Sequence, residues 1–528
     1  MLKRLLGATA ITALFLGPPA EGRAQSATPT PGGTAVVVVA TELQTLNPAI
    51  TSGSGEGVIG CMIHEGLVEI DGDGNIVPDL ARSWTISEDG LTYTFELAET
   101  NWHDGRPFTA RDVAFSFLNV NAKYAPLFAA QLGPKIAAIE PQGDHRVVVR
   151  LKEPFGPFLR MLTCWNGGAI VPEHIYTGSN PTTNPRSSAP IGTGPFRFEE
   201  WRTGDSIRLS RNTNYRKPGR PYLDGIVVRF MPNAPSRVQA MLAGEADYIQ
   251  KYYLPVSDIA TIGRNRTLKL EPASQAPNHL LGFFNVRRAP FNDARLRQAL
   301  FSLVDRRFIQ AAAFSRQGEP GTAPFPVGIT WAADPEINYD RMYPANVAAT
   351  NALLDQMGLR RAANGQRLRA NVTFEVGIPE RLRAATAIQA AWRQVGIEVE
   401  LRPLEPAVLA PRVFRDADFD IGLFSYGTYG DPALGIARIY ITSMIGFANG
   451  NGSGYSNPEV DRLFERAASL ADTRARGDVY RQIQRILAQE MPVMTLHENR
   501  GVDAASARLN GLWGYEGAGR FGEAWLAR

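Results

Sequence analysis

Apolar and polar residues alternate strictly over 91–97 (LTYTFEL), the pattern of a strand with one buried face. Turn-forming residues bracket this strand at 88–90 (EDG) and at 103–105 (HDG). Thr109 comes next and can cap a helix over 110–118, because its hydroxyl can accept a hydrogen bond from a free backbone N–H group. This region therefore predicts turn, strand, turn and capped helix, in that order.

The rest of the first half also alternates between strand and helix patterns. The apolar run over 35–40 shows no alternation, which indicates a strand buried on both faces. Further strands are expected at 146–151, 196–201 and 226–231. Ser236 is placed to cap the helix that follows the last of these strands.

Two helices in the second half have clear start signals. Apolar residues over 296–308 fall on one helical face, and Asn292 or Asp293 can cap that helix. Asn457 followed by Pro458 predicts another helix start, with proline at the first helical position.

A strand–helix–strand unit lies between these two helices. A strand is expected over 372–376, followed by a helix that ends at Gly396 and a second strand from 397 to 401. This order is typical of a parallel pair of strands in an α/β fold.

Four segments together carry a family resemblance. They are the region 66–118, the region 189–248 with APIGTGPF, RNTNY and GEAD, the segment 283–309, and GYSNPEVDRLFERA at 454–467. In this order they resemble family 5 of the bacterial extracellular solute-binding proteins, the substrate-binding proteins of peptide-type ABC importers. Each segment alone is moderately specific, whereas the set covers nearly the whole chain.

The resemblance implies an α/β fold, that of a two-lobed periplasmic binding protein of type II, similar to cluster C, with an extra subdomain in the first lobe. We then expect a discontinuous lobe I at 34–70, 190–278 and 495–528. A subdomain inserted in lobe I is expected at 71–189, and lobe II at 279–494. The chain would cross between the lobes at hinge residues Asn278, His279 and His497.

The resemblance also implies a function. We expect the chain to capture a peptide or peptide-like solute between its lobes, without chemistry on it and without a cofactor. Its partners would be the permease and ATPase subunits of the importer, and the protein itself is expected to be a monomer. The alternatives left open are a non-peptide cargo (an oligosaccharide, an opine or a metal complex), an exported hydrolase or a solute-sensing chaperone.

The N-terminus predicts export. Two basic residues at positions 3 and 4 precede an apolar run over 5–16, and small residues flank Arg23 at an expected cleavage site. We therefore expect a signal peptide at 1–24, a flexible leader at 25–33 and a periplasmic location for the mature chain.

The net charge of the chain argues against two classes of binding partner. The formal net charge is +3, of which +2 lies in residues 1–24, so the expected mature chain carries about +1 (3 − 2). A nearly neutral chain offers no electrostatic case for binding nucleic acid or an anionic membrane.

The chain has two cysteines, Cys61 and Cys164. A disulfide between them is compatible with an oxidising compartment. Both lie in apolar surroundings, however, and nothing in the sequence shows that they meet. We therefore slightly favour two separate buried thiols.

Several motifs imitate chemical sites. Residues 55–60 match GxGxxG, but they do not directly follow a strand, as a dinucleotide site requires. Asp71, Asp73 and Asn75 imitate the start of a calcium loop whose later positions carry the wrong residues. The six histidines lack metal-ligand spacing, so no metal site is expected.

The segment SYGTYGDP at 425–432 differs from peptide-binding members of the family. There the fourth position is an acidic residue that pairs with the α-amino group of the ligand, whereas this chain has Thr428. Because an unpaired buried ammonium is very costly, a peptide with a free N-terminus needs another carboxylate, such as Glu56 or Asp431. A neutral, sugar-like, opine-like or modified-peptide ligand therefore gains weight.

The candidate ligand-binding residues combine these segments with aromatic residues in loops, which offer contact area at low entropic cost. They are Thr51, Tyr252, Tyr253, Trp331, Ser425, Tyr426, Thr428 and Asp431.

Overall fold

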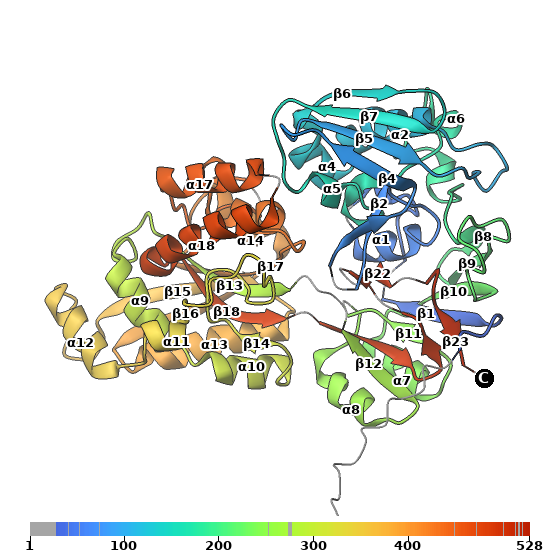
Figure 1. Cartoon of the computed structure of the whole chain (residues 1–528). Coiled ribbons are helices and arrows are strands. Elements are labelled where there is room, and N and C mark those ends of the chain that lie inside the picture. The colour runs from blue at the N-terminus through green and yellow to red at the C-terminus, as the bar shows by residue number, and fades with distance from the viewer. Residues whose placement is uncertain are drawn as a thin grey trace, which may run out of the picture.

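The computed structural model describes residues 28–527, apart from 41, 52, 73, 252, 273–276, 448, 471, 500, 513, 516, 517 and 520. The expected signal peptide and the first residues of the leader lie outside this part. Within it the chain forms two lobes, each built on its own sheet (Figure 1).

Lobe I is built on a seven-stranded sheet. Its order is β12 (Leu268–Pro272), β19 (Val502–Ser506), β11 (Tyr248–Ile249), β1 (Thr34–Val39), β10 (Gly225–Phe230), β9 (Ser206–Arg211) and β8 (Phe196–Arg202). Strand β1 is central and pairs in parallel with both β10 and β11. This agrees with the continuous apolar run, because a central strand is covered on both faces.

Shorter elements complete lobe I. Its helices are α1 (Ser54–Gly60), α7 (Ala234–Leu242) and α8 (Ile259–Arg264). Four two-residue strands close the C-terminus: β20 (Leu509–Asn510), β21 (Gly514–Tyr515), β22 (Ala518–Gly519) and β23 (Trp525–Leu526). The cap of α7 is Asn233 and not Ser236, because the Asn233 side chain accepts from the backbone N–H of Ser236 at 2.9 Å.

A second, four-stranded sheet lies in the part expected to be a subdomain. Its order is β4 (Ala81–Ile86), β5 (Thr92–Leu97), β7 (Arg146–Leu151) and β6 (Ile136–Pro141), and the hairpin β2 (Val68–Ile70) and β3 (Ile76–Pro78) precedes it. Its helices are α2 (Ala110–Phe115), α3 (Ala122–Tyr124), α4 (Pro126–Gln131), α5 (Phe158–Met161) and α6 (Glu173–Tyr176). The expected strand and capped helix are both present, since Thr109 and Asp112 form a reciprocal capping box at the start of α2.

Lobe II is built on a six-stranded sheet. Its order is β14 (Glu319–Pro320), β18 (Val493–Asn499), β13 (Asn278–Phe284), β17 (Ile421–Gly427), β15 (Leu368–Glu375) and β16 (Ile397–Leu404). Its helices are α9 (Ala294–Ser302), α10 (Arg306–Phe314), α11 (Tyr339–Met342), α12 (Val347–Gln356), α13 (Pro379–Arg393), α14 (Pro406–Ala410), α15 (Pro432–Gly435), α16 (Ala437–Tyr440), α17 (Pro458–Ser469) and α18 (Thr473–Glu490). The expected strand–helix–strand unit is β15–α13–β16, and its strands are parallel.

One helix expected in lobe II is two helices. Asp293 caps α9 and Asp305 caps α10, so the apolar stripe over 296–308 is interrupted. Phe308 is 53% exposed and does not join the stripe. It belongs to the second helix, whose buried face does not continue that of the first.

The chain passes between the two sheets twice. The first passage lies between β12 and β13, where residues 273–276 are outside the described part. The second lies between β18 and β19, so it follows Asn499 rather than residue 494. The division expected at 494/495 falls inside β18, all of whose pairs lie in the six-stranded sheet.

Candidate ligand-binding site

A cavity of about 430 Å³ lies between the lobes, at the ends of β13, β17 and β18. Lobe II contributes Asn278, His279, Leu280, Phe314, Ser425, Tyr426, Gly427, Tyr429, His497 and Asn499. The rest of the wall comes from Pro48, Thr51, Gly53, Gly57, Ala125, Pro126, Leu127, Trp165, Asn166 and Gly167. The size is that of a small-molecule site.

Strand register assembles the lobe II wall. Asn278 pairs with Gly427 of β17 and with Asn499 of β18, and His279 pairs with Tyr426. Residues that are distant in the sequence therefore meet at one end of the sheet, because directly paired residues lie side by side.

Both histidines of the cavity are held neutral. Burial lowers the pKa of His279 to about 3, and the nearby Arg438 contributes in the same direction. Burial also lowers the pKa of His497 to about 4, although its Nε2–H group donates to the Gln317 carbonyl at 2.8 Å. Phe314 stacks on the His497 ring, with centroids 3.7 Å apart.

Two tyrosines of the wall lie next to the same arginine side chain. The Arg438 guanidinium lies 5.0 Å from the ring centroid of Tyr426 and 5.8 Å from that of Tyr429. Burial raises the pKa of Tyr426 well above its ordinary value, so its hydroxyl stays protonated. Arg438 itself is not among the residues that line the cavity.

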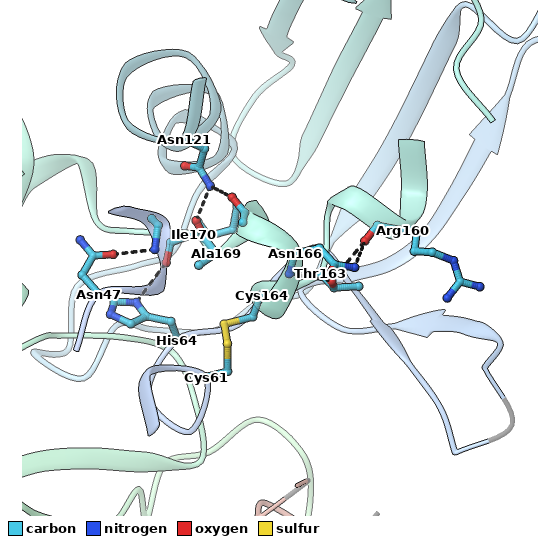
Figure 2. The surroundings of a disulfide bond; sticks show 12 residues. Asn47, Cys61, His64, Asn121, Arg160, Thr163, Cys164, Asn166, Ala169 and Ile170 are labelled. Atoms are coloured by element: carbon cyan, nitrogen blue, oxygen red, sulfur yellow. Dashed lines mark hydrogen bonds between the residues drawn. A yellow bond between two sulfur atoms is a disulfide. The ribbon is translucent and has the colours of Figure 1, made fainter. Parts of the chain in front are cut away.

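A disulfide supports the opposite wall. Cys61, directly after α1, is bonded to Cys164, and their Cα atoms lie 5.9 Å apart (Figure 2). The interpretation of two separate thiols was therefore wrong. The bond joins lobe I to the turn 164–168, which carries Trp165 and Asn166 into the cavity wall.

Close packing and side-chain hydrogen bonds position this turn further. A Cβ atom added at Gly57 would lie 2.4 Å from the Trp165 ring, so only glycine leaves room for the indole there. The Thr163 hydroxyl accepts from the backbone N–H of Asn166 at 3.3 Å, and the Asn121 amide donates to the carbonyls of Gly167 and Ala169 (Figure 2).

The expected site residues fall into two groups. Thr51, Ser425 and Tyr426 line the cavity, as do the three expected hinge residues Asn278, His279 and His497. Tyr253, Trp331, Thr428 and Asp431 are not among its lining residues, and Tyr252 lies outside the described residues.

Thr428 and Asp431 have local structural partners. Thr428 is fully buried, and its hydroxyl accepts from the backbone N–H of Gly430 at 3.4 Å. Both carboxylate oxygens of Asp431 accept from Arg476, at 2.8 and 2.6 Å, and the pair is buried. Trp331 lies over the same guanidinium at 5.1 Å.

Glu56, the other carboxylate considered for an ammonium, belongs to lobe I. Its Oε1 atom accepts from the backbone N–H of Gln44 at 3.1 Å, and it does not line the cavity. Neither Glu56 nor Asp431, the two carboxylates considered in place of Thr428, is therefore among the residues that line the cavity.

Sequence reasoning missed most of the wall that surrounds Trp165. Trp165 was not among the candidate residues, and Asn166, Phe314 and Asn499 carry no distinguishing pattern in the sequence. The disulfide was the signal that could have placed residues 164–167 beside α1.

A smaller cavity of about 110 Å³ lies on the other side of the disulfide. Its lining includes Glu65, Asp79 and Lys217, and Lys217 binds Asp79 at 2.9 Å. Arg216 binds Glu65 at 2.5 Å and also contacts Asp79. These opposite charges pair within the protein, which is the usual condition for burying them.

The other motifs that imitate chemical sites also have structural explanations. Residues 55–60 lie within α1, and Asp71 accepts from Asn75 in the β2–β3 turn, whereas Asp73 is outside the described residues. Among the residues that the structure describes, no cluster of His, Cys, Asp or Glu is placed to hold a metal ion. The described helices also include none with the length and apolar character needed to cross a membrane.

Comparison with known proteins gives a consistent result. Residues 75–443 match the model of the bacterial extracellular solute-binding proteins, family 5. Heme-binding protein A of Haemophilus influenzae is 29% identical over 472 residues, which cover 85% of this chain and 84% of that protein. A Brucella ovis protein named as a candidate ABC transporter peptide-binding protein is 29% identical over 456 residues, covering 83% and 82% of the two chains.

The fold is likewise shared with solved structures. The ABC transporter-associated periplasmic binding protein DppA of Helicobacter pylori, solved with the peptide STSA, superposes with a TM-score of 0.75. It is 22% identical, and the match covers 94% of this chain and 99% of that one.

Proposed function

Because the chain belongs to family 5 of the bacterial extracellular solute-binding proteins, we propose that it is the substrate-binding component of an ABC importer. It captures a peptide or peptide-like solute in the cavity between its lobes and delivers it to the permease. The observation that carries this proposal is a cavity lined from both lobes, at the two places where the chain passes between their sheets.

Capture works by closure of the lobes in this proposal. The two passages, near Asn278 and after Asn499, act as the hinge, and a bound solute shifts an existing equilibrium toward the closed form. The permease then distinguishes the closed form from the open one. Residues with expected ligand roles in this process are Thr51, Ser425 and Tyr426.

The location and fate of the solute follow from the same proposal. The signal sequence directs the mature chain to the periplasm, where it acts as a monomer. The solute leaves the cavity chemically unchanged, because binding and delivery are the whole activity.

The test is to purify the mature chain from the exported fraction and compare its native and denaturing mass spectra. A retained solute, lost on denaturation, is expected. Small-angle scattering should then show a smaller radius of gyration when this solute is added back to stripped protein. A protein that converts the solute to a product, or whose dimensions do not respond, contradicts the proposal.

A further inference from the structure

We propose that the cavity binds an uncharged solute that offers hydroxyl or amide groups, an inference that deepens the proposed function and rests on it. Among the described residues that line the cavity there is no Asp, Glu, Lys or Arg. The wall instead combines aromatic rings with amide, hydroxyl and imidazole groups.

The described residues of the wall include no anion for a free ammonium group. Asp431 is occupied by Arg476, as described above. Glu498 lies opposite His279 in the sheet, but it is buried outside the lining and its Oε2 atom accepts from the backbone N–H of Val327 at 3.0 Å. A peptide α-amino group would therefore enter the cavity without a compensating charge, which is strongly unfavourable.

The part of the wall that the structure describes also has no cation for a free carboxylate. Arg438 lies over the rings of Tyr426 and Tyr429 and is not among the lining residues, and its Nε–H group donates to the Gly435 carbonyl at 3.3 Å. The two histidines are neutral, so they add no positive charge either. An ionised solute of either sign would lose its hydration without gaining an ion pair.

Unmet polar groups on both sides of the cavity indicate what the solute must offer. Among the residues that the structure describes, neither ring nitrogen of His279 has a hydrogen-bond partner, and Oδ1 of Asn166 on the opposite wall has none. A buried polar group without a partner destabilises the protein, because it has lost its hydrogen bonds to water. A neutral imidazole has one donor and one acceptor, so a hydroxyl or an amide group can satisfy it.

These polar atoms are covered in the present arrangement. Their contact with a solute therefore requires a change of the wall, such as the lobe closure proposed above. The rings of Trp165, Phe314, Tyr426 and Tyr429 can meanwhile cover the apolar faces of the solute. Two sources share this chemistry: a neutral carbohydrate, and a peptide whose ends are blocked or joined in a ring.

The first test uses matched pairs of probes that differ only in ionised groups, measured by calorimetry on stripped full-length mature protein. One pair is trialanine and N-acetyl-trialanine amide, and the other is cellobiuronic acid and cellobiose. We expect the neutral member of at least one pair to bind ten or more times more tightly than its charged counterpart. The pair that responds identifies the source of the solute.

The outcomes separate this inference from the proposed function. Tighter binding of either charged member overturns the inference and leaves the proposed function standing. Binding of no probe, together with an empty protein in the native mass spectrum, overturns both.

The second test changes His279 and uses the neutral probe that binds most tightly. His279→Leu removes the donor and acceptor and should weaken binding at least tenfold, whereas His279→Gln keeps both and should retain most of the affinity. Thermal unfolding checks that both variants fold. Equal losses in the two variants would contradict a hydrogen-bonding role for this side chain.

Discussion

The two walls of the cavity are built in different ways. The lobe II wall consists of the ends of paired strands, in which Asn278 and His279 are placed by the register of β13 with β17 and β18. The opposite wall is an irregular turn, held by the Cys61–Cys164 bond and by the packing of Trp165 on Gly57. Strand register positions one wall through many backbone hydrogen bonds, whereas a few specific contacts position the other.

This difference predicts where single changes have local effects. A change at the turn should alter the cavity while most of the fold persists. A change in the core of lobe II, away from the residues that line the cavity, should act mainly on stability, because that core supports the sheet. The following experiments test this contrast, from the largest expected effect to the smallest.

The largest expected effect is on the stability of lobe II. Asp431→Asn leaves Arg476 buried without its anion, which should lower the free energy of unfolding by about 3–5 kcal/mol. Urea denaturation measures this loss. The affinity of the folded protein for its solute should change less than threefold, since Asp431 is not part of the wall.

A matched control for that change is Glu459→Gln, which breaks the exposed Glu459–Arg462 pair. Its expected cost is below about 1 kcal/mol, because solvent screens exposed pairs. A large loss of affinity in Asp431→Asn at unchanged stability would instead give Asp431 the ligand role expected from the sequence.

Removal of the disulfide should affect both stability and binding. The Cys61→Ser/Cys164→Ser variant opens a link that spans 103 residues, with an expected loss of about 2–5 kcal/mol. Solute affinity should fall as well, because Trp165 and Asn166 lose their fixed position. Reduction of the wild type with dithiothreitol should reproduce both effects and leave the double variant unchanged. A wild type that does not respond to reduction would contradict the role given to this bond.

Gly57→Ala tests the packing of the turn alone. Alanine favours the helix at this position by about 1 kcal/mol, but its Cβ atom would displace the Trp165 ring. We expect solute affinity to fall about tenfold, by calorimetry, without a lower melting temperature. Gly263→Ala in α8 is the control, since its Cβ would meet only Leu270 at 3.1 Å. Equal solute affinities in the two variants would show that the position of the Trp165 indole does not affect solute binding.

The smallest expected effect is that of pH on affinity. His279 and His497 have pKa values of about 3 and 4, so both stay neutral from pH 5 to pH 8 and affinity should be constant there. Arg438, Glu498 and Tyr426 also face His279. Titration by calorimetry at several pH values checks this. An affinity that rises on acidification through pH 6.5 would indicate a charged histidine in the complex.

Stability, unlike affinity, should depend on pH. The folded pKa values of these two histidines lie below the unfolded value of 6.5, so the unfolded chain binds more protons between about pH 4 and pH 6.5. Their contribution to stability is therefore complete above pH 6.5 and is lost as the pH falls toward 4. Asp503 acts in the opposite direction, because burial raises its pKa to about 6.

The sequence predicted the regular parts of this architecture well. Strand alternation located β5, and the uninterrupted apolar run located β1, because both patterns follow directly from which faces are buried. The family resemblance supplied the two lobes. The split of α9 from α10 was missed because the apolar spacing over 296–308 fits a single helix, and the cap at Asp305 was not recognised.

The cavity was predictable only in part. Ser425 and Tyr426 were found because their segment departs from a family pattern, whereas Asn166 and Asn499 carry no local signal. Their position depends on a disulfide and on strand register, both of which join residues far apart in the sequence. The pairing of Asp431 with Arg476 could not be predicted, because Arg476 lies on a helix distant in the sequence.

The central claim is that a solute binds between the two lobes and contacts both walls. Hydrogen exchange of the stripped protein, with and without the solute recovered from the exported form, tests it most directly. Solute binding should slow exchange at residues 165–169 and at residues 278–280 and 425–429 together. Protection confined to one lobe, or centred on the smaller cavity beside Glu65 and Arg216, would contradict it.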